Sequence, residues 1–197
     1  MSASAVQICN LALMKFGNLS ITSITAPTNK EERTCQVFYP VIRDELVAAH
    51  PWNFAMKRAD ISAQLADTPP FGFDFAYQLP TDCLRVWEMQ GAEEWVVESG
   101  QLLTNQDVEI FIRYIRVVED TGSFPPAFVN CLATRLAAEL AAKLSDDKPM
   151  RQALLEELYK VALPAAYRLN AIEGNKPRHK DEQSMDNGNF SWQTSGR

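Results

Sequence analysis

The sequence predicts an α+β fold that is mainly α: an antiparallel bundle of about four helices, a small inserted antiparallel β domain and an extended C-terminal arm. Apolar residues recur with helical spacing in the first and last thirds of the chain. Prolines and β-branched or aromatic runs mark the middle. The final residues contain few apolar side chains. These shifts place the helical bundle in residues 1–51 and 119–173, the β-rich insert in 52–118 and the arm in 174–197.

Two helices are expected in the first 51 residues. A serine at position 2 or 4 can cap the first helix, and Gly17 can end it. The second helix starts near Asn29, with acidic residues in its first turn, and ends at His50. Pro40 lies inside its apolar pattern, which predicts either a kink or a later start.

The middle of the chain is expected to form one small antiparallel sheet. A tight turn at residues 98–101 should join two of its strands. In the last strand Ile110, Ile112 and Tyr114 alternate with other residues, so this side should pack inward. The expected strands are Phe75–Leu79, Leu84–Met89, Trp95–Val97, Leu102–Leu103 and Ile110–Val118.

Helices are expected again after Gly122. Two prolines at 125 and 126 suit the first turn of a long helix, and Asp146–Asp147 can cap the next one. Pro164 predicts a bend in that last helix, and Gly174 its end. Its buried face is expected to comprise Leu154, Leu158, Val161, Ala165, Leu169 and Ile172.

Composition bounds the classes of function. The chain has 197 residues and a net charge of −6, which argues against broad nucleic-acid binding. No secretory signal or membrane-length apolar run is visible, so we expect cytoplasmic synthesis and no membrane partner. The four cysteines are widely spaced, which predicts free thiols and no metal site.

The search for catalytic residues indicates no enzyme and no cofactor. Only two histidines occur, His50 and His179, and neither is paired with a nucleophile in the sequence. Adjacent acidic pairs such as Glu93–Glu94 are expected to be solvated surface charge. No glycine-rich phosphate loop or HExxH motif is present.

Two features stand out. At the end of the second helix, Trp52 and Phe54 are expected either to plug a helix–sheet junction or to face a partner. In the arm, Phe190 and Trp192 are two rings in an otherwise polar segment with four basic and three acidic residues. An extended strand would place both rings on one side, ready for a partner's pocket or sheet edge, although plain terminal disorder is the alternative.

Blocks of sequence in a particular order resemble the tail tubular protein A family of tailed-phage head-to-tail adaptors, also called tail accessory factors. The similarity spans about residues 3–172 and rests on the order and spacing of the blocks. The blocks are Arg43–Leu46 followed by His50–Ala55, then Tyr77–Val86, then Phe124–Phe128 followed by Leu136–Ala141.

This resemblance implies a structural adaptor (connector) in the virion, assembled in the host cytoplasm. It would form a homo-oligomeric ring, typically of 12 copies, beneath the portal protein. The ring would extend the channel through which double-stranded DNA passes without specific binding, and would carry the tail nozzle or tube protein. The candidate portal-docking residues, all in the arm, are Arg178, Phe190, Trp192 and Arg197, and the candidate structural junction is Trp52, Asn53, Phe54 and Arg85.

Two other functions stay open at the level of sequence. One is a cell-wall hydrolase associated with the phage tail, for which Glu45, Glu93 and Glu94 are the carboxylates to test. Such an enzyme needs two carboxylates in one cleft, one of them with a raised pKa. The other is a monomeric assembly factor, which would stay monomeric beside the portal.

Overall fold

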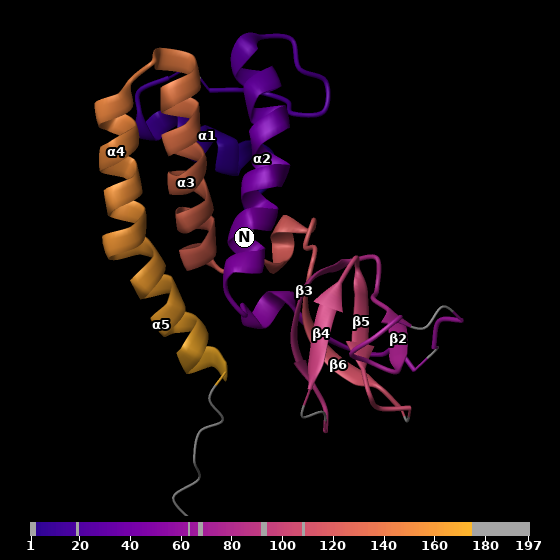
Figure 1. The fold of residues 1–197 in the computed structure, drawn as a ribbon. Helices are drawn as coiled ribbons and strands as arrows, with labels where there is room; N and C mark the ends of the chain where they lie inside the picture. Colours follow the sequence, from indigo (N-terminus) through magenta and orange to yellow (C-terminus); the bar gives the residue numbers. More distant parts are fainter. Residues whose placement is uncertain are drawn as a thin grey trace, which may run out of the picture.

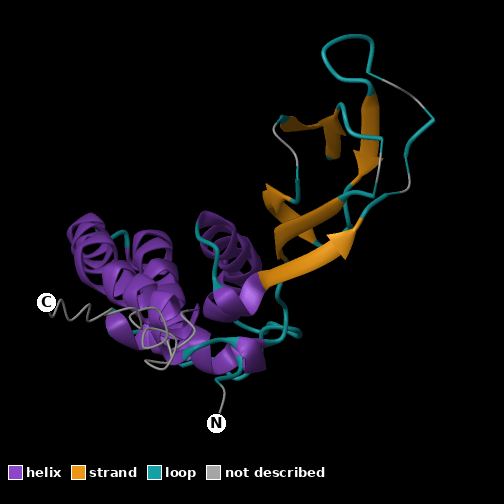
Figure 2. Cartoon of the chain, turned by 90° about the horizontal axis from the view of Figure 1, so that it is seen from below, coloured by secondary structure: helices purple, strands orange, loops and turns teal. Residues whose placement is uncertain are grey.

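The computed structural model describes residues 3–18, 20–62, 64–66, 69–91, 94–107 and 109–174. Its fold is a mixture of helix and sheet with more helix than strand, which confirms the expected α+β class. The helices gather on one side and the strands project beside them (Figure 1). A second view, turned by 90°, shows the same separation of helical and strand layers (Figure 2).

The central helix of the helical part is α3, which contacts each of the other helices. Two predicted caps are confirmed, at Ser4 and Asp147, since each side chain accepts a backbone N–H of the turn that follows. Asn29, near which the second helix was expected to start, caps that helix in the same way. Gly17 follows α1 with φ +76°, a left-handed conformation that glycine favours. The bounds are α1 (Ala5–Lys15), α2 (Lys30–Ala49), α3 (Pro126–Ser145), α4 (Lys148–Glu157) and α5 (Leu163–Gly174).

Pro40 lies inside α2 and not at its start. The helix continues through it from Asn29, which caps the first turn, to His50, which ends the last. Pro40 is exposed, so its ring lies on the solvent side of α2. Of the two outcomes that the sequence left open, the later start is therefore wrong.

The strands form two three-stranded antiparallel sheets, with orders β1–β6–β3 and β2–β5–β4. The single sheet predicted from the sequence is therefore wrong. The first strand was missed because Met56–Asp60 contains no β-branched residue, and it becomes a strand by pairing along β6. The bounds are β1 (Met56–Asp60), β2 (Phe75–Gln78), β3 (Cys83–Met89), β4 (Trp95–Glu98), β5 (Gln101–Thr104) and β6 (Phe111–Arg116).

Two separate clusters of apolar side chains lie on opposite faces of β6. Ile112 and Tyr114 belong to the cluster between the two sheets, as predicted for this side of the strand. Ile115 points the other way and joins the core of the helical part. The four cysteines are free thiols, as expected, and Cys9, Cys35 and Cys131 are buried in that helical core.

The buried face of the last helix differs from the prediction. A π-helical turn, Leu158–Ala162, separates α4 from α5 and takes about one extra residue. After Leu158 the buried positions are therefore Ala162, Leu163 and Ala166. The predicted face is wrong after Leu158, because Val161, Ala165, Leu169 and Ile172 are exposed.

The bend was predicted at Pro164, but the π turn lies just before this residue. Within the π turn the N–H of Leu163 donates to the carbonyl of Leu158, five residues back. Pro164 then stands second in α5, directly after the π turn, which interrupts the regular hydrogen-bond pattern that a proline would break. Figure 1 shows that the helix axis changes direction between α4 and α5.

Candidate functional site

The docking residues expected in the arm, Arg178, Phe190, Trp192 and Arg197, lie outside the described residues. The residues expected at the structural junction are all described. Three of these, Trp52, Asn53 and Phe54, follow α2 directly, whereas Arg85 lies on β3. The site is therefore built from the α2–β1 connection outward.

Trp52 is buried at this connection, with 2% of its surface exposed. Its indole Nε1 donates a hydrogen bond of 2.9 Å to the carbonyl of Leu46 in the last turn of α2. The ring packs edge-on against Phe128 of α3, with centroids 5.1 Å apart, and lies 5.4 Å from Tyr167 of α5. Phe54 packs edge-on against Phe128 as well, at 4.9 Å. The junction therefore joins three helices at the point where the strands begin.

Asn53 ties the same connection to α5 by polar contacts. Its backbone N–H donates to Oδ1 of Asn170 over 2.8 Å, and its Nδ2 donates to the Asn170 carbonyl over 2.6 Å. Asn170 Nδ2 donates in turn to the carbonyl of Pro51 over 3.3 Å. The role of Asn170 was not predicted from the sequence, because its partners lie 117 and 119 residues away and no local pattern marks such a pair.

His50 belongs to this junction too. Its ring stacks on Tyr167 with centroids 4.1 Å apart, and its Nε2 accepts from Asn170 Nδ2 over 3.3 Å. Burial lowers the pKa of His50, which favours the neutral ring that can accept this bond. These contacts link the end of α2 to α5, and His50 is also the residue at which α2 ends, as expected from the sequence.

Arg85 does not join the junction. It lies exposed on β3, with its guanidinium 5.7 Å from the ring centroid of Trp87. Its strand neighbour Leu84 packs against the helical core, but Arg85 does not. The junction expected from the sequence thus comprises Trp52, Asn53 and Phe54 without Arg85.

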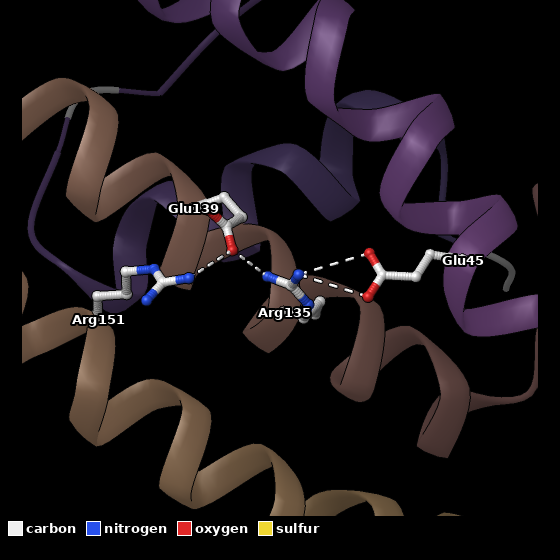
Figure 3. A network of polar contacts seen from close by, with 4 residues as sticks. All are labelled: Glu45, Arg135, Glu139 and Arg151. Carbon is white, nitrogen blue, oxygen red and sulfur yellow. Dashed lines mark hydrogen bonds and ion pairs between the residues drawn. The ribbon is translucent and has the colours of Figure 1, made fainter. Parts of the chain in front are cut away.

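A polar network of four side chains joins three of the helices (Figure 3). Glu139 of α3 accepts from Arg135 of the same helix and from Arg151 of α4, the latter over 3.2 Å. Arg135 Nη2 also reaches both carboxylate oxygens of Glu45 on α2, at 3.4 Å. The alternating charges tie α2, α3 and α4 together around an arginine whose side chain is 15% exposed.

The network favours a structural role for its carboxylates. Burial alone would raise the pKa of Glu139, but the hydrogen bond and charge of Arg135, followed by those of Arg151, lower it below its ordinary value. A general acid needs a raised pKa instead. Glu45 lies on α2 and Glu94 beside β4, so the structure does not bring these two hydrolase candidates together, and Glu93 lies outside the described residues.

Glu32 is a structural residue that sequence reasoning placed only as a helix-start acid. It is 2% exposed, and its two carboxylate oxygens accept from the backbone N–H and hydroxyl groups of Thr22 and Thr28. These hydrogen bonds, the backbone one from Thr28 first, lower the pKa of Glu32 to about 2. One buried carboxylate thus holds the loop between α1 and α2 in place.

Among the described residues, no group of histidine, cysteine and carboxylate side chains has the arrangement of a metal site. No described helix has the length and apolarity needed to cross a bilayer. A comparison of the chain with models of known protein families and with curated proteins found no match.

Proposed function

We propose that this protein is a structural head-to-tail adaptor of a tailed bacteriophage. Copies of the chain form a ring beneath the portal protein, extend the DNA channel and provide the platform on which the tail nozzle or tube protein assembles. In this proposal the protein is a virion component of the head–tail connector, assembled in the host cytoplasm, and has no catalytic role.

The observation that carries the proposal is where the resembling sequence blocks lie in the fold. The block His50–Ala55 covers the end of α2 and the buried junction. The block Tyr77–Val86 leads from β2 into β3, and the block Phe124–Phe128 begins α3. The first and last of these blocks lie at the chain's crossings between helices and strands, and the middle block joins the two sheets, so the resemblance concerns how the parts of the fold are joined.

The same proposal includes a finer architecture. We infer that residues 1–51 and 119–173 act as one antiparallel bundle, and that residues 52–118 are an insert. The two apolar clusters support this division, since the helical one draws on both ends of the chain and the other only on the insert. The arm of residues 174–197 extends to the portal through Phe190 and Trp192.

Charge supports a channel role. A ring through which a genome slides should not grip phosphates strongly, because each neutralised phosphate adds binding free energy. The net charge of −6 per copy suits such a channel better than a basic subunit would. Heterologous contacts between copies close the ring.

The test is the native mass of the protein mixed with the purified portal ring encoded by the same phage genome. We expect a discrete complex with about one copy of the protein per portal subunit. Deleting residues 174–197 should leave the fold intact, because both apolar clusters lie within residues 3–167, and should abolish this complex. Circular dichroism of the deletion variant checks the fold.

A matched variant tests whether binding depends on the two aromatic rings of the arm or only on the arm's length. Phe190→Ser with Trp192→Ser keeps all residues and should also lose the complex, whereas Met185→Ser in the same segment should retain it. Undiminished affinity of the deletion variant for the portal would contradict the role of the arm. No complex under any condition would contradict the adaptor function itself.

A further inference from the structure

The sheet β1–β6–β3 presents three arginines on one face. Strand pairing sets Arg58 of β1 directly opposite Arg113 of β6. Arg85 of β3 pairs with Ile115, two residues further along β6. Cross-strand partners point to the same side of a sheet, and so do residues two apart on one strand. All three arginines therefore project from the same face.

That face points away from the second sheet. The opposite face carries Ile112 and Tyr114, which pack with Tyr77 and Leu102 of the sheet β2–β5–β4. The arginine face is covered by the helical part only at one end, where Ile115 enters the helical core. Figures 1 and 2 both show the strands standing clear of the helices over the rest of their length.

Two exposed aromatic rings flank the arginines. Trp87 is 39% exposed beside Arg85, and Phe111 is 38% exposed at the far end of β6. Between the strands lies a shallow hollow of about 370 Å³. Its lining includes Arg58, Asp60, Glu88, Gln90, Phe111 and Arg113.

The positive charge on this face is only partly balanced from within. Glu88 Oε2 lies 3.6 Å from Arg113 Nη1. Asp60 Oδ1 accepts hydrogen bonds from the hydroxyl and the N–H of Ser62. Arg58 faces Arg113 across the strands, an arrangement of like charges that destabilises a sheet unless an anion lies nearby. The face thus suits carboxylates from outside.

The rest of the insert has the opposite charge. Residues 52–118 contain five basic and ten acidic residues, and the arginine face holds three of the former and two of the latter. The remainder therefore carries two basic and eight acidic residues. Among these, Asp74, Glu94 and Asp107 are exposed around the loop at Asn105, which accepts the Asp74 N–H over 3.0 Å.

We infer that, in the proposed ring, the arginine face of one copy binds the acidic end of the next copy's insert, formed by Asp74, Glu94 and Asp107. This inference rests on the proposed function. Two different faces of one chain meet, as a closed ring requires. Guanidinium groups bind carboxylates in a forked geometry, and arginine and tryptophan are enriched at protein contacts. The carboxylates in the hollow favour a protein partner over a phosphate backbone.

The test is a charge-reversal pair measured by native mass on the portal ring. Arg58→Glu with Arg85→Glu alters two exposed side chains, and circular dichroism verifies that the fold is retained. We expect ring assembly to weaken roughly tenfold or more, since like charges brought together across an interface are strongly unfavourable. Arg33→Glu, an exposed residue of α2, is the matched control and should assemble normally.

The complementary variant reverses the other side, with Asp74→Lys and Glu94→Lys. Alone it should fail as well, but an equal mixture of the two double variants should assemble into rings of alternating copies. Normal assembly of the arginine variant, or no rescue in the mixture, overturns the inference and leaves the adaptor function standing. Failure of the unaltered protein to bind the portal overturns both.

A nucleic-acid role for the face gives a different result. A fluorescent single-stranded 20-nucleotide DNA would then bind the unaltered protein and lose its binding in the arginine variant, while assembly of that variant stayed normal. That outcome overturns the inference, whereas assembly that is lost with no DNA binding at any salt supports it.

Discussion

At the scale of single residues, Trp52 does more than fill space. Its ring contacts aromatic side chains from α3 and α5, and its indole N–H caps a carbonyl at the end of α2. The sequence predicted a ring at a helix–sheet junction from the position of Trp52 after His50–Pro51. It could not predict that the buried N–H finds its acceptor in Leu46, because that depends on how α2 ends.

Trp52→Ala should therefore destabilise the protein by about 3 to 5 kcal/mol, the range for large-to-small substitutions of buried aromatic residues. The loss combines removed contacts with the cavity left among the neighbouring rings. Urea unfolding followed by circular dichroism measures it. Trp87→Ala is the control, because Trp87 is 39% exposed, and it should cost less than about 1 kcal/mol. Equal effects of the two substitutions would contradict this view of the junction.

At the scale of elements, the π turn between α4 and α5 decides which side of the last helix is buried. Pro164 explains its position. In a continuous α-helix the proline ring would clash with the carbonyl four residues back, and the wider π turn at Leu158–Ala162 avoids this. The turn also brings Asn170 round to Asn53.

Deleting Lys160, which is exposed within the π turn, should make the segment a regular α-helix with the same buried residues. It should also place Pro164 in a helix interior and so cost about 3 kcal/mol. The double variant with Pro164→Ala should regain most of that loss, while Pro164→Ala alone should change stability little. Thermal unfolding of the three variants checks this, and additive effects of the two changes would speak against the link.

At the scale of the whole molecule, carboxylates hold loops and helices in their places. Glu32 organises the loop between α1 and α2, and Glu139 lies in the network that joins α2, α3 and α4. Both have a pKa below the ordinary value. A lowered folded-state pKa means that the unfolded chain binds protons first, so stability is lost as the pH falls.

We therefore expect the melting temperature to fall between about pH 4.5, the ordinary pKa of a glutamate, and about pH 2, the folded-state pKa of Glu32. Above that window the stabilisation by Glu32 is fully present. Glu32→Gln should lower the melting temperature at pH 7 and flatten its dependence on pH in the acid range. Glu31→Gln, which changes the adjacent carboxylate and leaves the loop's hydrogen bonds in place, should keep the dependence of the unaltered protein.

The sequence by itself determined what depends on near neighbours along the chain. The helix caps, the turn between β4 and β5 and the inward side of β6 follow from residues within a few positions of one another. The same local reasoning places Trp52 and Phe54 at a helix–strand boundary.

Only the tertiary structure decided what depends on partners from distant segments. The strand Met56–Asp60 exists because β6 supplies its hydrogen bonds. The strands form two sheets because β2 and β4 pair with β5, whereas β1 and β3 pair with β6. The shift of the last helix face follows from one π turn that periodicity cannot show. Asn170 and the arginine face arise from contacts across more than 100 residues and from strand register, respectively. Such contacts form only when the chain closes on itself, so no local pattern carries them.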